Sequence, residues 1–440
     1  MAGAALATLL VGCAGDDGGG PTAEPSGSEA EAHAVGLQQE TYVDDTRTTP
    51  AHGDDGELAQ RTLVTDILYP AEGDPASSAV VEGAAPDAGG APYPLVVFAH
   101  GLGGSFEYYQ ALLEGWAAAG YVVAAPRFPL TYADTPGGPD GADVQQQPGD
   151  VSFVIDQVLA ASEGEGALSG LVDPEAIGVA GHSNGAITTL GLVANSCCRE
   201  ERVGAAVVLA GTNAPFADGE YDLTDTPPIF FVHGTEDAQL AYGAAVTLFN
   251  DAVGPKGLLT VEGGTHGSWL EDEGLDGVVE ATTDFLAAEL RGDAGAEERL
   301  AAFAAPSMTL DWVAEEGSTV TIPTLPQPET DRMATATPTT DLTAGQLVTV
   351  TWEGFLPDGT VNIVQCAGDG RTGGSAACDL EDAYILQPDP TGSGSTQIDM
   401  VVGAVGTGVC DASHPCTLVV NDSALQDDDA IIRIPLTFAA

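Results

Sequence analysis

The stretch 176–190, with the sequence AIGVAGHSNGAITTL, constrains the fold more than any other part of the chain. A short apolar, β-branched run leads to Gly181, and apolar residues recur at helical spacing after Gly185, so we expect a buried strand, a tight turn and a helix. Ser183 lies at the centre of this turn, in the pattern G-x-S-x-G. A strand-to-helix turn of this kind projects a serine hydroxyl above a sheet, which indicates a nucleophile for acyl transfer.

The pattern alone is weak evidence, because a chain with 57 glycines in 440 residues can contain it by accident. The alternative is a glycine-rich turn in which Ser183 only caps the following helix. The apolar run before the turn and the helical spacing after it favour the nucleophile.

A serine is a weak nucleophile unless a base takes its proton and a carboxylate orients that base. We predict that His266 is the base, because it lies in a glycine-rich loop, 263–269, that follows a short strand. The other six histidines occupy polar leader segments, strand ends, the serine turn itself or a different domain: His33, His52, His100, His182, His233 and His414.

The acid should lie between the serine and the histidine in chain order, at the end of another strand. Residues 228–232 are the predicted strand, and Asp237 lies three residues beyond Gly234 in its exit loop. We favour Asp237 over the adjacent Glu236. The alternative role for Asp237 is to cap a helix predicted over 238–249.

Developing negative charge on a substrate oxygen needs two preorganised backbone N–H groups. Asn184 supplies one, as the residue after the nucleophile. The predicted second donor is Leu102, in the sequence HGLGG that follows the apolar strand 95–99. Glycines on both sides of Leu102 let the main chain approach a substrate closely.

Taken together, the motifs at 100–104, 181–185, 233–237 and 265–266 resemble the serine hydrolases of the α/β-hydrolase superfamily. Within it, residues 40–295 resemble the group of platelet-activating-factor acetylhydrolases, chlorophyllase-like proteins, dienelactone-hydrolase-like proteins and polyester hydrolases. The resemblance implies an α/β fold with a mostly parallel central sheet, and carboxylic ester hydrolysis through an acyl-enzyme without a cofactor. Dienelactone hydrolases use cysteine as nucleophile, so Ser183 departs from them and their lactone chemistry is not implied.

Many such hydrolases carry a helical lid before the strand that bears the acid. Here only residues 212–226 are available for one, so we expect no large cap. The long connection 127–148 should border the site, because it follows a strand end. An open cleft of this kind would admit bulky or polymeric esters.

The charge of the chain excludes one class of partner. Eleven basic residues against 66 acidic ones give a net charge of −55, which argues against nucleic acid binding. A disordered acidic chain is the alternative, but 44% hydrophobic residues and clear strand periodicity favour packed domains.

The N-terminus indicates export. Residues 4–11 form an apolar run too short to span a bilayer, and it ends at Leu10-Val11-Gly12-Cys13. This resembles a bacterial lipobox, in which Cys13 is lipid-modified, although a basic segment before the run is missing. We therefore expect a signal segment over 1–13, a flexible tether over 14–38, membrane contact only through the lipid and a cell-surface location. Ordinary secretion and an accidental apolar terminus are the alternatives.

Further cysteines agree with an oxidising compartment. Cys366 and Cys378 enclose a glycine-rich loop and Cys410 and Cys416 a tight one, so each pair is a candidate disulfide.

Cys197 and Cys198 are adjacent, and are expected either to join each other or to pair elsewhere after rearrangement. No C-x-x-C spacing supports a metal site, so we expect none.

The pattern of residues along the sequence changes after Arg291. We expect the hydrolase domain over 39–295, a connecting segment and linker over 296–340, and a small antiparallel β-sandwich over 341–440. One set of residues in the sandwich carries a family resemblance: Gly345, Trp352, Gly354-Phe355, Gln365-Cys366-Ala367, Cys378, Cys410 and Cys416. In this pattern the sandwich resembles the neocarzinostatin-like apoprotein family, which implies an immunoglobulin-like fold with a ligand cleft. Apolar residues of the connecting segment are candidates to pack back on the hydrolase: Leu300, Phe303, Met308, Leu310 and Trp312.

Two interpretations from different classes remain. In the first, Ser183 is the nucleophile of an extracellular serine esterase whose partner is an ester substrate; a serine peptidase is the rival within the enzymes. In the second, the hydrolase is inactive and the chain is a surface binding or adhesion protein that acts through the sandwich. The intact serine, histidine and aspartate favour the esterase.

Overall fold

The computed structural model describes residues 32–439 apart from 53–55, 77–79, 215, 217–218, 238, 324–331, 356–360, 371–376, 380–383, 387–388, 390 and 423–430. The predicted signal segment with Cys13, and most of the predicted tether, lie outside the described residues. None of the helices formed by the described residues combines the length and apolarity needed to cross a bilayer.

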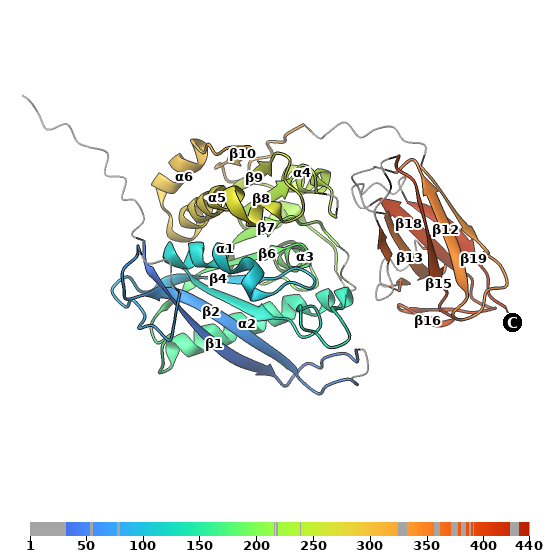
Figure 1. Ribbon diagram of the computed structural model, residues 1–440, viewed down its shortest axis with the longest axis horizontal. Coiled ribbons are helices and arrows are strands. Elements are labelled where there is room, and N and C mark those ends of the chain that lie inside the picture. Colours follow the sequence, from blue (N-terminus) through green and yellow to red (C-terminus); the bar gives the residue numbers. More distant parts are fainter. Residues whose placement is uncertain are drawn as a thin grey trace, which may run out of the picture.

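The first domain is built on one ten-stranded sheet with the order β10-β9-β8-β7-β6-β4-β5-β2-β1-β3 (Figure 1). The strands from β5 to β9 in this order run parallel. They are β5 (Val122–Arg127), β4 (Tyr93–Ala99), β6 (Val172–His182), β7 (Val203–Leu209), β8 (Ile229–Gly234) and β9 (Lys256–Val261). β4, β8 and β9 are buried along their whole length, as continuous apolar runs are in a parallel sheet covered on both faces.

The edges of the sheet are antiparallel. β2 (Arg61–Ala71) pairs with β5 and with β1 (Ala34–Asp44), and β10 (Met308–Val313) pairs with β9. The two-residue strand β3 (Val81–Glu82) lies parallel to β1.

Helices cover both faces of the sheet and form two separate cores (Figure 1). α2 (Gln147–Glu163), α3 (Asn184–Ala194) and α4 (Tyr242–Asp251) pack on one face, and α1 (Phe106–Ala118), α5 (Asp272–Arg291) and α6 (Ala294–Ala301) pack on the other. The predicted α/β fold with a mostly parallel sheet is confirmed. The apolar residues expected to pack back from the connecting segment do so, against the core beneath α1 and α5: Leu300, Phe303, Met308, Leu310 and Trp312.

Both boundaries of the hydrolase domain differ from the predicted ones. Residues 34–38, assigned to the tether, belong to β1 and pair with 67–71 of β2. At the other end, α6 and β10 continue the domain beyond 295, because β10 completes the sheet beside β9. Residues 34–38 and β10 belong to the sheet because they pair with the distant strands β2 and β9, which the local pattern does not reveal.

In the second domain, the ladders between the described strands are all antiparallel. One sheet has the order β11-β12-β15, a second β14-β13-β18-β19, and β16 and β17 form a ribbon. It begins at β11 (Met333–Thr337), before the predicted boundary at 341. The remaining bounds are β12 (Leu347–Glu353), β13 (Val361–Ala367), β14 (Tyr384–Leu386), β15 (Gly394–Asp399), β16 (Gly403–Val405), β17 (Gly408–Cys410), β18 (Cys416–Asp422) and β19 (Ile432–Leu436).

Disulfide bonds join Cys366 to Cys378 and Cys410 to Cys416 in this second domain. In the first domain, Cys197 is joined to its neighbour Cys198, just after α3.

Candidate active site

Ser183 lies at the junction of β6 and α3 with a φ of 55°, a left-handed conformation that is unfavourable for a residue with a side chain. Two glycines make this turn possible. A Cβ atom at Gly181 would collide with the carbonyl of Gly185, and one at Gly185 would collide with the carbonyl of Ala99 on β4. The glycines of the motif are therefore required by close backbone contacts.

Asp237 follows β8, and one of its carboxylate oxygens lies 2.7 Å from Nδ1 of His266. The other oxygen accepts the N–H groups of Gln239 and Leu240, at 2.8 and 2.9 Å. The carboxylate does not cap α4, which begins later than predicted, at Tyr242. Its backbone contacts instead fix Asp237 in the loop so that it faces His266.

Asp237 keeps its charge although its side chain is fully buried. Burial acts to raise the pKa of this carboxyl, but hydrogen bonds from His233 and His266, together with their electrostatic interaction with the carboxylate, outweigh burial, so the pKa lies well below its ordinary value. Nε2 of His233 lies 3.1 Å from the same carboxylate oxygen that faces His266. The acid is therefore ionised at neutral pH.

His266 presents its second ring nitrogen as an acceptor. Because an ionised carboxylate can only accept, the proton on His266 is assigned to Nδ1, which leaves a lone pair on Nε2. Nε2 is buried and has no hydrogen-bond partner among the described residues. A neutral imidazole in this state can take a proton from a hydroxyl.

The histidine loop lies against the serine turn. The imidazole rings of His182 and His266 are 4.9 Å apart, centre to centre, and Nε2 of His182 is 2.7 Å from the carbonyl oxygen of His266. His182 directly precedes Ser183. The loop that carries the predicted base therefore lies against the turn that carries the predicted nucleophile.

The loop after β4 borders the same turn, because a Cβ atom at Gly101 would lie 3.2 Å from Cβ of Ser183. The N–H of Gly103 donates to Thr131 and that of Gly104 donates back to Gly101. In contrast, no hydrogen bond from the N–H of Leu102 or Asn184 to another described residue is formed. In the described part of the chain, these two N–H groups are therefore unpaired, as the predicted oxyanion role requires.

A chain of buried hydrogen bonds that sequence reasoning missed connects these parts. The N–H of Gly101 donates to the hydroxyl of Tyr109, and this hydroxyl lies 3.0 Å from Nδ1 of His182. Since the His266 carbonyl can only accept, His182 carries its proton on Nε2 and accepts from Tyr109 through Nδ1. The oxyanion loop, the serine turn and the base loop are held together through Tyr109 and His182.

Two of the histidines set aside at the sequence level are thus buried and neutral. Burial lowers the pKa of His182 to about 3, with His266 adding to the effect, and lowers that of His100 to about 4. Nδ1 of His100 lies 2.8 Å from the Gly101 carbonyl, and its Nε2 accepts the N–H of Phe128. Both histidines lie at the carboxyl end of apolar strands, where the binding sites of α/β sheets form. This position was the available sequence signal that they belong to the site.

The neutral state of His182 predicts a pH dependence of stability. Its folded pKa lies below the unfolded value of about 6.5, so its contribution is complete above that pH and is lost as pH falls toward about 3. A His182→Gln variant lacks this term. We expect urea unfolding between about pH 7 and pH 5 to show that the free energy of unfolding falls less steeply with pH for the variant. The difference in slope should correspond to the uptake of up to about one proton fewer on unfolding. Parallel curves for the two proteins would contradict a neutral, buried His182.

No group of three or more His, Cys, Asp or Glu side chains in the described part of the chain is arranged to hold a metal ion.

Comparison with known proteins gives two family matches. Residues 54–240 match the Chlorophyllase family and residues 334–438 match the Neocarzinostatin family. Among solved structures, a ferulic acid esterase from Streptomyces cinnamoneus is similar, with 23% sequence identity over 59% of this chain and 91% of that chain, and a TM-score of 0.46. The search of curated proteins returned no match.

The two family matches confirm both resemblances and the order of the two domains. The first domain is a carboxylic ester hydrolase with an α/β-hydrolase fold, similar to chlorophyllases. The second is a neocarzinostatin-like β-sandwich.

Proposed function

We propose that the chain is a serine esterase in which Ser183 is the nucleophile, His266 the general base and Asp237 the residue that orients it. Leu102 and Asn184 are the proposed oxyanion donors. The observation that supports this most is the buried Asp237–His266 pair, because it leaves Nε2 of His266 without a partner beside the Ser183 turn.

Each step of the reaction follows from these groups. Nε2 of His266 takes the Ser183 proton as Oγ bonds to the ester carbon, and the carbonyl electrons move to an oxygen that the two N–H groups stabilise. The tetrahedral intermediate collapses as the C–O bond to the alcohol breaks, and His266 returns its proton to the leaving oxygen. Water, activated by His266, then attacks the acyl-enzyme in the same way, and the acid and the free serine are released.

Substitution of the three side chains tests the assignment. Ser183→Ala and His266→Ala should each lower kcat for a chromogenic ester by about 10⁴-fold or more, because Ser183 forms the bond to the substrate and His266 takes the proton. Asp237→Asn should lower kcat somewhat less, because Asp237 acts through His266. Glu236→Gln is the matched control for the acid, since it lies next to Asp237 but is exposed. A larger loss in Glu236→Gln than in Asp237→Asn would overturn the choice of acid.

We further propose that the cleft is open to bulky or polymeric esters. Between β7 and β8 the described residues form only the short helix η2 (Leu223–Asp225), so no helical lid from this connection covers the site there. An open cavity of about 280 Å³ lies beside His266. It is lined by Tyr108, Glu236, Gln239, Thr265, His266, Gly267, Ser268 and Glu271.

The charge of this cavity predicts a preference among esters. The described residues of its lining include Glu236 and Glu271 and no arginine or lysine, so a substrate group that enters it meets negatively charged side chains. For esters matched in size, kcat/KM should be lowest for an anionic alcohol group and higher for neutral and cationic ones, at low salt. The double variant Glu236→Gln, Glu271→Gln should reduce this discrimination.

A matched control removes the same charge elsewhere. Glu165 and Glu175 are exposed and lie before or at the start of β6, at the opposite end of that strand from Ser183. The double variant Glu165→Gln, Glu175→Gln should keep the full discrimination. Equal effects of both double variants would show that the overall charge of the chain, rather than the cavity, selects the substrate.

We propose that the protein acts outside the cytoplasm, attached through a lipid on Cys13. Three disulfides among the described residues support an oxidising compartment. In a bacterial host fed a labelled fatty acid, the full chain should incorporate label and a Cys13→Ser variant should not. Secretion of both forms without label would contradict the anchor.

A further inference from the structure

We infer that Gln147 is a positioning residue that holds both sides of the oxyanion site at once. The inference rests on the proposed roles of Leu102 and Asn184. Gln147 is the first residue of α2 and is fully buried, yet it lies in the connection between β5 and α2 and outside the motifs that define the site.

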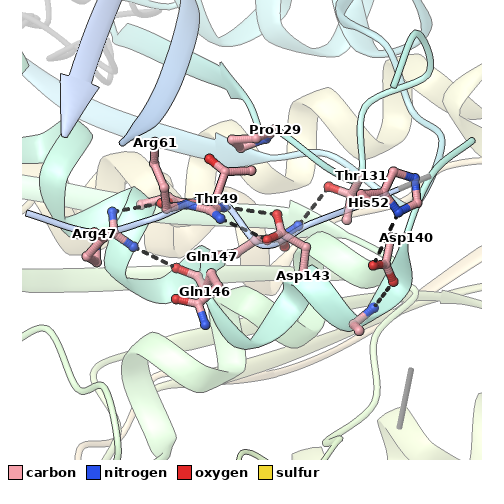
Figure 2. A network of polar contacts seen from close by, with 12 residues as sticks. Arg47, Thr49, His52, Arg61, Pro129, Thr131, Asp140, Asp143, Gln146 and Gln147 are labelled. Atoms are coloured by element: carbon pink, nitrogen blue, oxygen red, sulfur yellow. Dashed lines mark hydrogen bonds and ion pairs between the residues drawn. The ribbon is translucent and has the colours of Figure 1, made fainter. Parts of the chain in front are cut away.

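One end of the Gln147 amide supports the oxyanion loop. Its Nε2 donates to the hydroxyl of Thr131 at 2.8 Å, as Figure 2 shows. The carbonyl of Thr131 in turn accepts the N–H of Gly103 at 2.8 Å. Gly103 directly follows Leu102, so the position of the Leu102 N–H depends on where Thr131 lies.

The other end of the amide supports the start of α3. The hydroxyl of Thr188 donates to Oε1 of Gln147 at 2.5 Å and lies 3.2 Å from the carbonyl oxygen of Asn184. Thr188 is one helical turn beyond Asn184, the second proposed donor. A single amide, with a donor at one end and an acceptor at the other, therefore spans the segments that carry both N–H groups.

Buried ion pairs fix Gln147 itself. Arg61 on β2 bonds to Asp143, in the short helix η1 (Gly141–Gln145) that precedes Gln147, and to Asp150 one turn after it, over distances of 2.6 to 2.9 Å. The side chains of Arg61, Asp143 and Asp150 are 0% exposed. Arg47 also donates to the Gln146 carbonyl at 3.1 Å (Figure 2).

This arrangement makes the Gln147 side chain a rigid spacer. Displacing it would separate buried, charge-assisted pairs, which is strongly unfavourable. Oxyanion donors act only when they are preorganised within a fraction of an ångström of the developing charge. The amide at 147 thus contributes to the rate without touching the substrate.

The test is Gln147→Met, which keeps the length of the side chain and removes both hydrogen bonds. We expect kcat for a chromogenic ester to fall by about 10- to 100-fold with little change in KM, less than the loss caused by deleting a donor outright. Affinity for a trifluoromethyl ketone, which forms a tetrahedral oxyanion with the serine, should fall in parallel. Affinity for the matched methyl ketone should stay within about twofold.

Milder variants guard against a folding defect. Thr188→Val is isosteric and breaks only the link to α3, so it should give an intermediate loss, and adding Gln147→Met to it should cost less than Gln147→Met alone. Gln110→Met is the matched control, because the Gln110 side chain bonds to Glu114, one turn further along α1, and to no other described residue. It should leave both kcat and ketone affinity unchanged.

Amide hydrogen exchange provides a readout that does not depend on catalysis. Exchange at Gly103 should accelerate in Gln147→Met and not in Gln110→Met, even if the wild-type protein hydrolysed no ester. A wild type that fails to bind the trifluoromethyl ketone would defeat the proposed function alone. Unchanged exchange at Gly103, or loss of kcat without selective loss of ketone affinity, would overturn the role of Gln147.

Discussion

The geometry of the site depends on the main chain at Ser183, which turns from β6 into α3 through a left-handed conformation. Such a conformation costs on the order of 1–3 kcal/mol and persists only where the surroundings enforce it. Here the enforcing contacts are backbone to backbone, between Gly181 and Gly185 and between Gly185 and Ala99. The two strands β4 and β6 are therefore locked together where the proposed nucleophile and the oxyanion loop meet.

Around this turn, neutral hydrogen-bonded groups surround one buried charge. Asp237 is ionised, whereas burial keeps His100 and His182 neutral and therefore free to act as fixed donors and acceptors. The backbone assigns the direction of each bond, since Gly101 can only donate and the carbonyl of His266 can only accept. Among the described residues, Nε2 of His266 has no partner, and the His266 ring lies against His182 of the serine turn.

The sequence allowed prediction of the residues that end parallel strands. Ser183 and Asp237 each follow an apolar strand whose carboxyl end must reach the same edge of the sheet, so chain order and strand ends were enough to nominate them. Tyr109, His182 and Gln147 could not be assigned this way, because their partners lie 8 to 84 residues away and depend on side-chain packing. Residues 34–38, the first part of β1, were missed for a similar reason, because pairing with β2 defines them as strand.

The central claim is that the hydroxyl at 183 is activated by the imidazole at 266. Reaction of the full chain with a fluorophosphonate, followed by mass spectrometry of its peptides, tests this most directly. We predict a single adduct on Ser183, absent from Ser183→Ala and formed at a greatly reduced rate in His266→Ala. An adduct on another residue, or ester hydrolysis by a chain that acquires none, would contradict it.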